Sequence, residues 1–188
     1  MAPSKTAKIK LPSGIEPGRI RIVMVCEAFP ENMRDYFYSS SDSLYVTNTV
    51  DAFNNAGIKV KSIVDIVDKG VYLTVAVKEP RKGLVVPAKT IEKYSGELEE
   101  ELDLFPNIKA ILLMGDAAIK ALNLISRRLY KARAIPAGST YKIRHEKFYF
   151  GKIRAFPSYL PTGKNFLIEK SKQRMVAEDI RNAFKLVG

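Results

Sequence analysis

The residues best suited to chemistry lie in the segment 154–166, where hydroxyl, aromatic, cationic and amide side chains follow one another closely. Pro157, Pro161 and Gly163 interrupt regular structure and predict a loop. An amphipathic pattern begins directly after it, so we expect the loop to end at a helix N-terminus, where backbone N–H groups favour anions. The segment therefore indicates a binding site for a polyanion, although its composition suits an ordinary connection between a strand and a helix equally well.

Three carboxylates form a second group, just beyond a β-branched run at 20–25. They are Glu27, Glu31 and Asp35. The run predicts a buried parallel strand, and ligands of open α/β sheets bind beyond the carboxyl ends of such strands. The acids could face a ligand there, or they could be helix-start acids or solvated loop charges. The aromatic residues at 36–38 follow and suit base stacking, whereas one or two of them could belong to the core.

Hydrophobic periodicity predicts alternating strands and helices over residues 19–188. Strands are expected at 20–25, 71–77, 108–114 and 152–156, with a two-stranded element within 135–150 and a short strand followed by a helical turn at 58–67. Helices are expected at 43–56, 90–102, 117–129 and 166–186. This order predicts an α/β fold, a three-layer α/β/α sandwich with a mostly parallel central sheet. Residues 1–18 predict a flexible basic arm, which leaves 19–188 as a single domain.

The chain carries a strong positive charge, with 31 Lys and Arg against 20 Asp and Glu and a net charge of +11 over 188 residues. An excess of this size implies an anionic partner, and nucleic acid is the leading candidate. The alternative is that the charge only keeps the protein in solution.

The sequence offers little for metal or cofactor chemistry, so we expect neither. Cys26 is the single cysteine and His145 the single histidine, which excludes iron–sulfur or zinc sites made of several such ligands from one chain. No apolar run approaches about 18 residues, and the first residues contain no apolar signal core. These features predict a cytoplasmic, nucleoid-associated protein that is a monomer and does not contact membranes.

Three segments resemble the uracil-DNA glycosylase superfamily, nearest to its bacterial and archaeal families 4 and 5. Residues 20–31 (IRIVMVCEAFPE) resemble the first motif, a strand followed by Gly-Glu-Ala-Pro-Gly. Residues 106–118 (PNIKAILLMGDAA) resemble the strand, glycine and helix that precede the second motif. Residues 156–161 (FPSYLP) resemble the second motif, His-Pro-Ser-Tyr-Leu, and 176–180 (VAEDI) fit the helix after it. The order and spacing of the segments add to the resemblance.

The resemblance implies a fold, an activity and a set of site residues. A glycosylase flips a base, reads its edge, stabilises it as it leaves and positions a water. Glu27 aligns with the glutamate of the first motif and would activate water, with Glu31 and Asp35 as alternatives. Phe37 or Tyr38 would stack on the base. Leaving-group stabilisation would come from one of three residues, which are Asn165, Lys164 and Ser158.

Two family positions that bind the base hold different residues here. Val75 stands where relatives carry the asparagine that reads uracil, and Phe156 replaces the second-motif histidine. Cys26 replaces the motif glycine, and the cysteines of family 4 are absent. The DNA-binding part of the second motif is retained. Tyr159 and Leu160 would be the minor-groove wedge, and phosphates would be bound by Ser158 and Lys164.

Three functions are consistent with these patterns. The first is a DNA glycosylase, a hydrolase of base excision repair, that removes uracil or another deaminated base without metal or cofactor. The second is a relative that has lost catalysis and serves as a nucleic-acid-binding module. The third, an enzyme acting on small molecules, would need a phosphate-binding glycine loop after the first strand, and residues 26–30 lack one.

Overall fold

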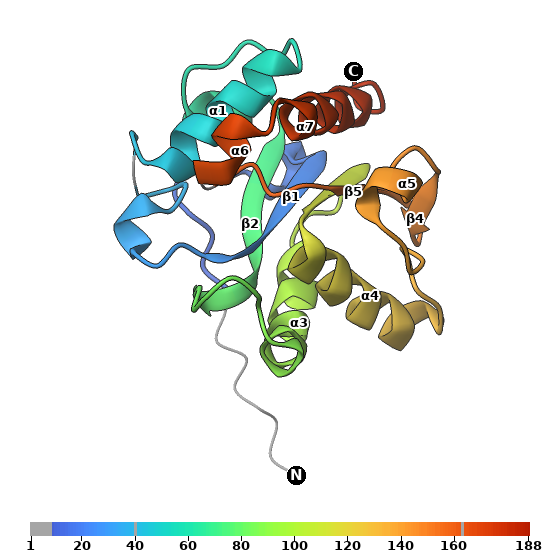
Figure 1. The fold of residues 1–188 in the computed structure, drawn as a ribbon. Coiled ribbons are helices and arrows are strands. Elements are labelled where there is room, and N and C mark those ends of the chain that lie inside the picture. The colour runs from blue at the N-terminus through green and yellow to red at the C-terminus, as the bar shows by residue number, and fades with distance from the viewer. Residues whose placement is uncertain (1–8, 40, 163) are drawn as a thin grey trace.

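The computed structural model describes residues 9–39, 41–162 and 164–188 (Figure 1). Its centre is a five-stranded sheet in the order β2 (Val71–Pro80), β1 (Ile22–Phe29), β3 (Ala110–Met114), β5 (Ile153–Ser158) and β4 (Phe148–Phe150). The first four strands are parallel, and β4 pairs antiparallel with β5 at one edge. The mostly parallel central sheet predicted from the sequence is therefore confirmed.

The central strand β1 shows why the sequence forms this sheet. Ile22, Met24 and Cys26 pack into the core on one side, while Val23 and Val25 pack into the core on the other. All five side chains are buried. Because both faces of the strand are covered, the sequence is a continuous apolar run rather than an alternation of apolar and polar residues.

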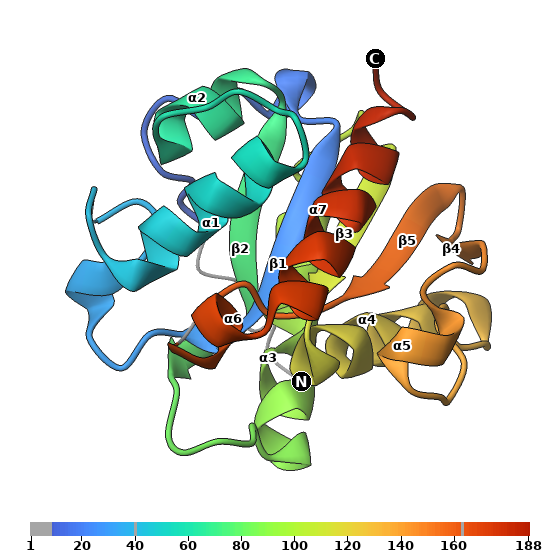
Figure 2. The same cartoon turned by 45° about the horizontal axis from the view of Figure 1, so that its top comes forward.

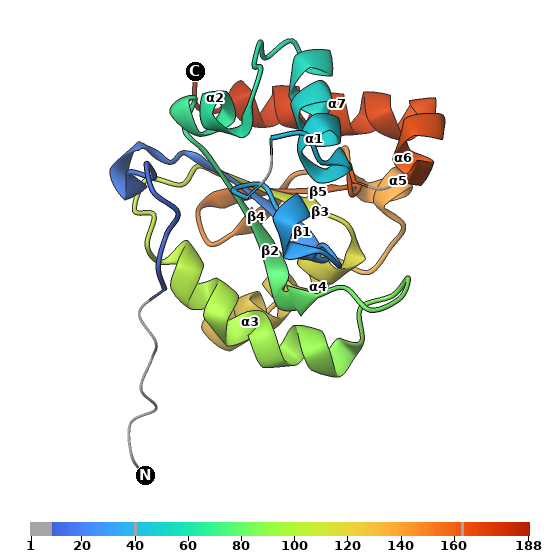
Figure 3. The ribbon, with the colours of Figure 1, turned by 90° about the vertical axis from the view of Figure 1, so that its left-hand side faces the viewer.

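Helices cover both faces of the sheet, and Figure 3 shows the three layers. One face packs against α3 (Ala88–Leu102) and α4 (Asp116–Tyr130). The other packs against α1 (Leu44–Asn55), α2 (Ile63–Asp68) and α7 (Lys170–Phe184). Shorter helical elements are η1 (Pro17–Arg19), η2 (Met33–Asp35), α5 (Thr140–Ile143) and α6 (Lys164–Ile168). The arrangement agrees with the predicted α/β/α sandwich.

Two elements of the first half differ from the sequence-based prediction. Residues 58–62 form no strand, because the Asn54 side chain forms hydrogen bonds with the backbone of Val60. It accepts from the Val60 N–H at 3.1 Å and donates to the Val60 carbonyl at 2.9 Å. Strand β1 continues to Phe29 rather than ending at Val25, because β2 pairs with it along this whole length. Glu27 therefore lies within the strand and not beyond it.

Two elements of the second half also differ. The first part of the predicted two-stranded element is the short helix α5, and only β4 pairs with β5. The predicted helix at 166–186 is divided at Glu169, whose φ of −84° and ψ of 78° are not helical, into α6 and α7. Within the described residues, no helix has the length and apolar character needed to cross a membrane.

Candidate active site at the carboxyl end of the sheet

The carboxyl ends of the parallel strands border a hollow of about 340 Å³. In Figure 2 this end of the sheet is at the bottom of the view, where the loop after β2 and helix α6 also lie. The hollow joins four separate segments, which contribute Phe29, Glu31 and Asp35, then Leu44 and Tyr45, then Arg81, and finally Leu160 and Thr162. Both motif segments identified in the sequence thus meet here, together with an arginine that the sequence did not single out.

Glu27 lies beside this hollow without lining it, and both of its carboxylate oxygens have partners. Oε1 accepts from the backbone N–H of Ala117 at 3.2 Å, in the first turn of α4, and Oε2 accepts from Arg81 Nη1 at 3.0 Å. The Glu27 side chain is only 14% exposed. The carboxylate therefore ties β1 to the positive end of a helix dipole and to the residue after β2.

Gly115 makes room for this carboxylate. A Cβ atom at this position would lie 2.6 Å from Glu27 Oε1, and the backbone has a φ of +105°, which other residues rarely adopt. The glycine between the predicted strand and helix is thus required by a contact with a residue of β1. The sequence identified the glycine but gave no sign of that contact.

Arg81 forms the cationic side of the hollow. Besides binding Glu27, its Nε donates to the Gly83 carbonyl at 3.0 Å, and its Nη2 donates to the Leu84 carbonyl. The guanidinium therefore fixes the turn that follows β2. Nothing in the sequence marked this residue beyond its basic type, because its partner Glu27 is 54 positions away.

The turn held by Arg81 presents an apolar tip to solvent. Leu84 is 89% exposed and Val85 is 75% exposed, and Lys82 is exposed beside them. Two large apolar side chains flanked by cations favour an interface that combines apolar and anionic groups. The run of apolar residues after Gly83 was the available signal in the sequence.

The residues predicted to bind a base do not line the hollow. Phe37, Val75 and Phe156 are buried in the core on the α1 and α7 side of the sheet. Tyr38 is half-buried, and its hydroxyl donates to the Leu73 carbonyl at 2.9 Å and accepts from the Leu73 N–H at 3.0 Å. The structure therefore places these four side chains in packing positions.

The predicted DNA-binding residues have three different environments. Ser158 is 1% exposed, and its hydroxyl donates to Asp179 Oδ2 at 2.6 Å, so it anchors the loop rather than facing solvent. Tyr159 is half-buried with Lys172 Nζ 5.6 Å from its ring centre, and Leu160 lines the hollow. The side chains of two predicted residues lie outside the part that the structure describes, namely Lys164 and Asn165.

A buried network behind this loop holds it to α7. Arg144, whose side chain is 2% exposed, donates from Nη2 to Asp179 Oδ1 at 2.8 Å and to Glu178 Oε2 at 2.9 Å. Asp179 in turn accepts from Ser158. The network joins α5, α7 and the end of β5, so the position of Leu160 depends on a guanidinium 16 positions earlier in the chain.

Burial raises the pKa of Asp179 from 3.8 to about 6, against the opposing effects of the Ser158 hydrogen bond and the Arg144 charge. The folded protein therefore keeps this proton in a pH range where the unfolded chain has lost it. We expect the free energy of unfolding to fall by about 1.4 kcal/mol per pH unit from this group as the pH rises from about 4 to about 6. Urea unfolding at several pH values, compared with Asp179→Asn, measures the effect. Parallel pH profiles of the two proteins would contradict it.

Among the described residues, no three histidine, cysteine or acidic side chains are grouped so that they could hold a metal ion. The hollow instead offers two carboxylates, a guanidinium and apolar walls. A search of models of known protein families and a search of curated proteins both find no match to this chain.

Proposed function

We propose that the protein binds DNA at the carboxyl end of its sheet and hydrolyses the N-glycosidic bond of uracil or another deaminated base. The observation that carries the proposal is the hollow itself, where Glu31 and Asp35 meet Arg81 and Leu160. This reaction needs a carboxylate that activates water, a cation that stabilises the departing base, and an apolar wedge that fills the space of the flipped base. The hollow, about 340 Å³, is within the size range of small-molecule sites.

The charges of the chain support DNA as the partner. The net charge of +11 favours a polyanion, and the apolar tip of Leu84 and Val85 lies beside Lys82 at the same end of the sheet. Exposed apolar side chains enter base steps in proteins that bend or open DNA. In this arrangement, the cations hold phosphates while Leu84 and Leu160 occupy space between bases.

In the proposed reaction, the oxygen of water forms a bond to C1′ of the deoxyribose as the bond from C1′ to the base nitrogen breaks. The electron pair of that bond leaves with the base, and the Arg81 guanidinium stabilises the resulting anion. Asp35 or Glu31 takes the proton from water and the leaving base is finally protonated from solvent. Glu27, with both oxygens engaged, serves to position Arg81 rather than to activate water.

A base-release assay with variants tests this assignment. Asp35→Asn or Glu31→Gln is expected to lower the single-turnover rate of uracil release by about 10²–10⁴-fold, because the proton acceptor is lost. Alkali-labile sites in oligonucleotides containing uracil, hypoxanthine or xanthine provide the readout. Asp51→Asn is the matched control, since Asp51 is an exposed carboxylate on α1 that does not line the hollow. Intact oligonucleotides after long incubation with all three substrates would overturn the hydrolytic role.

A second candidate is a nucleic-acid-binding module without catalysis. It is favoured because both carboxylate oxygens of Glu27 already have hydrogen-bond partners within the protein. It is also favoured because Phe37, Val75 and Phe156, at the positions where the family binds the base, are buried and have no access to a ligand. It predicts DNA affinity that falls by about 10³-fold or more between 50 and 200 mM salt, with no base release. A salt titration by fluorescence anisotropy, carried out with the cleavage assay, separates the two candidates.

A further inference from the structure

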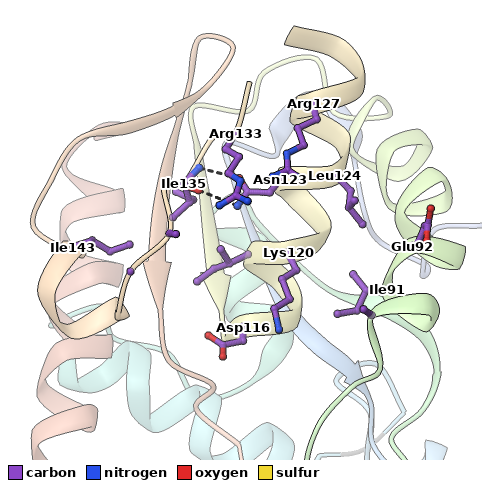
Figure 4. A pocket seen from close by; sticks show the side chains of 14 residues that line it. Ile91, Glu92, Asp116, Lys120, Asn123, Leu124, Arg127, Arg133, Ile135 and Ile143 are labelled. Carbon is purple, nitrogen blue, oxygen red and sulfur yellow. Dashed lines mark hydrogen bonds between the residues drawn. The ribbon is translucent and has the colours of Figure 1, made fainter. Parts of the chain in front are cut away.

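A second and larger hollow lies on the opposite layer of the molecule and shares no lining residue with the first. It measures about 460 Å³ and is bordered by α3, α4 and the segment 133–143 (Figure 4). This volume lies in the range of sites that bind small molecules. Because the two hollows share no lining residue, binding here can be tested separately from the proposed action on DNA.

The walls of this hollow are largely apolar. Five branched side chains form them, contributed by α3, α4, α5 and the segment before α5, and these are Ile91, Ile119, Leu124, Ile135 and Ile143. Such a surface excludes water from an apolar ligand and supplies the hydrophobic part of the binding free energy. The ligand must therefore carry an apolar body.

One wall is held in place by an amide. Asn123 Nδ2 donates to the Ile135 carbonyl at 2.9 Å, and the Ile135 N–H donates to Asn123 Oδ1 at 2.9 Å, as the dashed lines in Figure 4 show. This reciprocal pair fixes the segment that carries Arg133 against the middle of α4. The hollow is thus part of the folded structure and does not have to be formed by a ligand.

Cations outnumber carboxylates among the residues that line the hollow. Lys120, Arg127 and Arg133 line it, against two carboxylates, Glu92 and Asp116. Within the described part of the chain, neither Arg127 nor Arg133 forms an ion pair, whereas their neighbour Arg128 binds Glu99 at 2.6 Å. An anion with an apolar body suits this arrangement, because two guanidinium groups without carboxylate partners lie beside an apolar wall.

We propose that this hollow binds a phosphate monoester of an apolar compound, with the phosphate on Arg127 and Arg133 and the apolar body against Ile119 and Leu124. A phosphate monoester carries nearly two negative charges at neutral pH and matches two guanidinium groups better than a carboxylate does. Guanidinium groups also bind phosphate oxygens in pairs, which fixes the orientation of the ligand.

Titration of the full chain with 1-naphthyl phosphate tests the proposal. Binding is monitored by NMR, through the amide resonances of α4 and of residues 133–138. We expect saturable binding that shifts these resonances, about tenfold or more weaker binding of 1-naphthoate, and no saturation with the uncharged 1-naphthol. The variant Arg127→Gln/Arg133→Gln should weaken binding of 1-naphthyl phosphate by about tenfold or more.

Arg128→Gln is the matched control, because it removes an arginine of the same helix that is already paired with Glu99. It should bind 1-naphthyl phosphate as the unmodified chain does. The proposal is wrong if the double variant retains full affinity, if Arg128→Gln loses as much, or if the shifted resonances lie elsewhere. Displacement of the naphthyl phosphate by a short oligonucleotide at equal concentration would also overturn it, since the hollow would then belong to a nucleic-acid site.

Discussion

Arg144→Met is expected to lower the free energy of unfolding by about 3–5 kcal/mol. The Arg144 side chain is 2% exposed and is bound to Asp179, Glu178 and the Met175 carbonyl. Methionine fills similar space but leaves the buried Asp179 carboxylate without a counter-charge. Desolvation of that unpaired charge, rather than loss of the attraction alone, is the reason for so large an effect.

Urea unfolding at pH 7.5 provides the measurement, and two further variants make it specific. Arg144→Met/Asp179→Asn should recover most of the lost free energy, because no buried charge is then unpaired, while the amide oxygen introduced by this variant can still accept from Ser158. Arg174→Met, at an exposed position of α7, should change the free energy of unfolding by no more than about 0.5 kcal/mol. Equal destabilisation by the single and the double variant would show that packing, and not charge, is what Arg144 contributes.

Arg81→Met is expected to lower the rate of base release by about 10²–10³-fold, if the proposed hydrolysis is correct. Arg81 is the cation of the first hollow and has Glu27 as its ion-pair partner at 3.0 Å. Its loss removes the group that stabilises the leaving base and also frees the turn that carries Leu84. Single-turnover cleavage of a uracil-containing oligonucleotide measures this rate.

Two variants separate the chemical role of Arg81 from a structural one. Lys82→Met removes an adjacent exposed cation and should weaken DNA binding slightly without changing the single-turnover rate at saturation. Arg81→Lys keeps the charge but cannot hold Glu27 and the turn together, so it should restore only part of the rate. A rate unchanged in Arg81→Met at saturating protein would remove Arg81 from the reaction.

The sheet could be predicted from the sequence because long runs of apolar, mainly β-branched residues indicate strands whose two faces are both buried, as at residues 22–26. The C-terminal helix was predicted as one element because its apolar spacing continues through Glu169, where only the backbone angles break it. Residues 141–150 alternate like a strand, yet Thr140–Ile143 is helical. A three-residue β4 remains to pair with β5. Local pattern therefore identified the main elements and missed the interruptions.

The candidate site was harder to predict, because its contacts join residues far apart in the sequence. Glu27 could be recognised from its place in a motif. Its hydrogen bonds to Arg81 and to the first turn of α4 could not, because they depend on how β1, the loop after β2 and α4 come together in the fold. The inward positions of Phe37 and Val75 depend on which face of the sheet each packs against. A motif gives the residue types, whereas the direction of each side chain is a property of the assembled layers.

The contact between Tyr38 and Leu73 also bears on the open edge of the sheet. Strand β2 is an outer strand of the sheet, so the backbone groups along its free side could accept a strand from another chain. The Tyr38 hydroxyl satisfies both the N–H and the carbonyl of Leu73 on that side. A phenol thus takes the place of a neighbouring strand at Leu73, the third residue of β2, and the N–H and carbonyl of this residue are not free to pair with another chain.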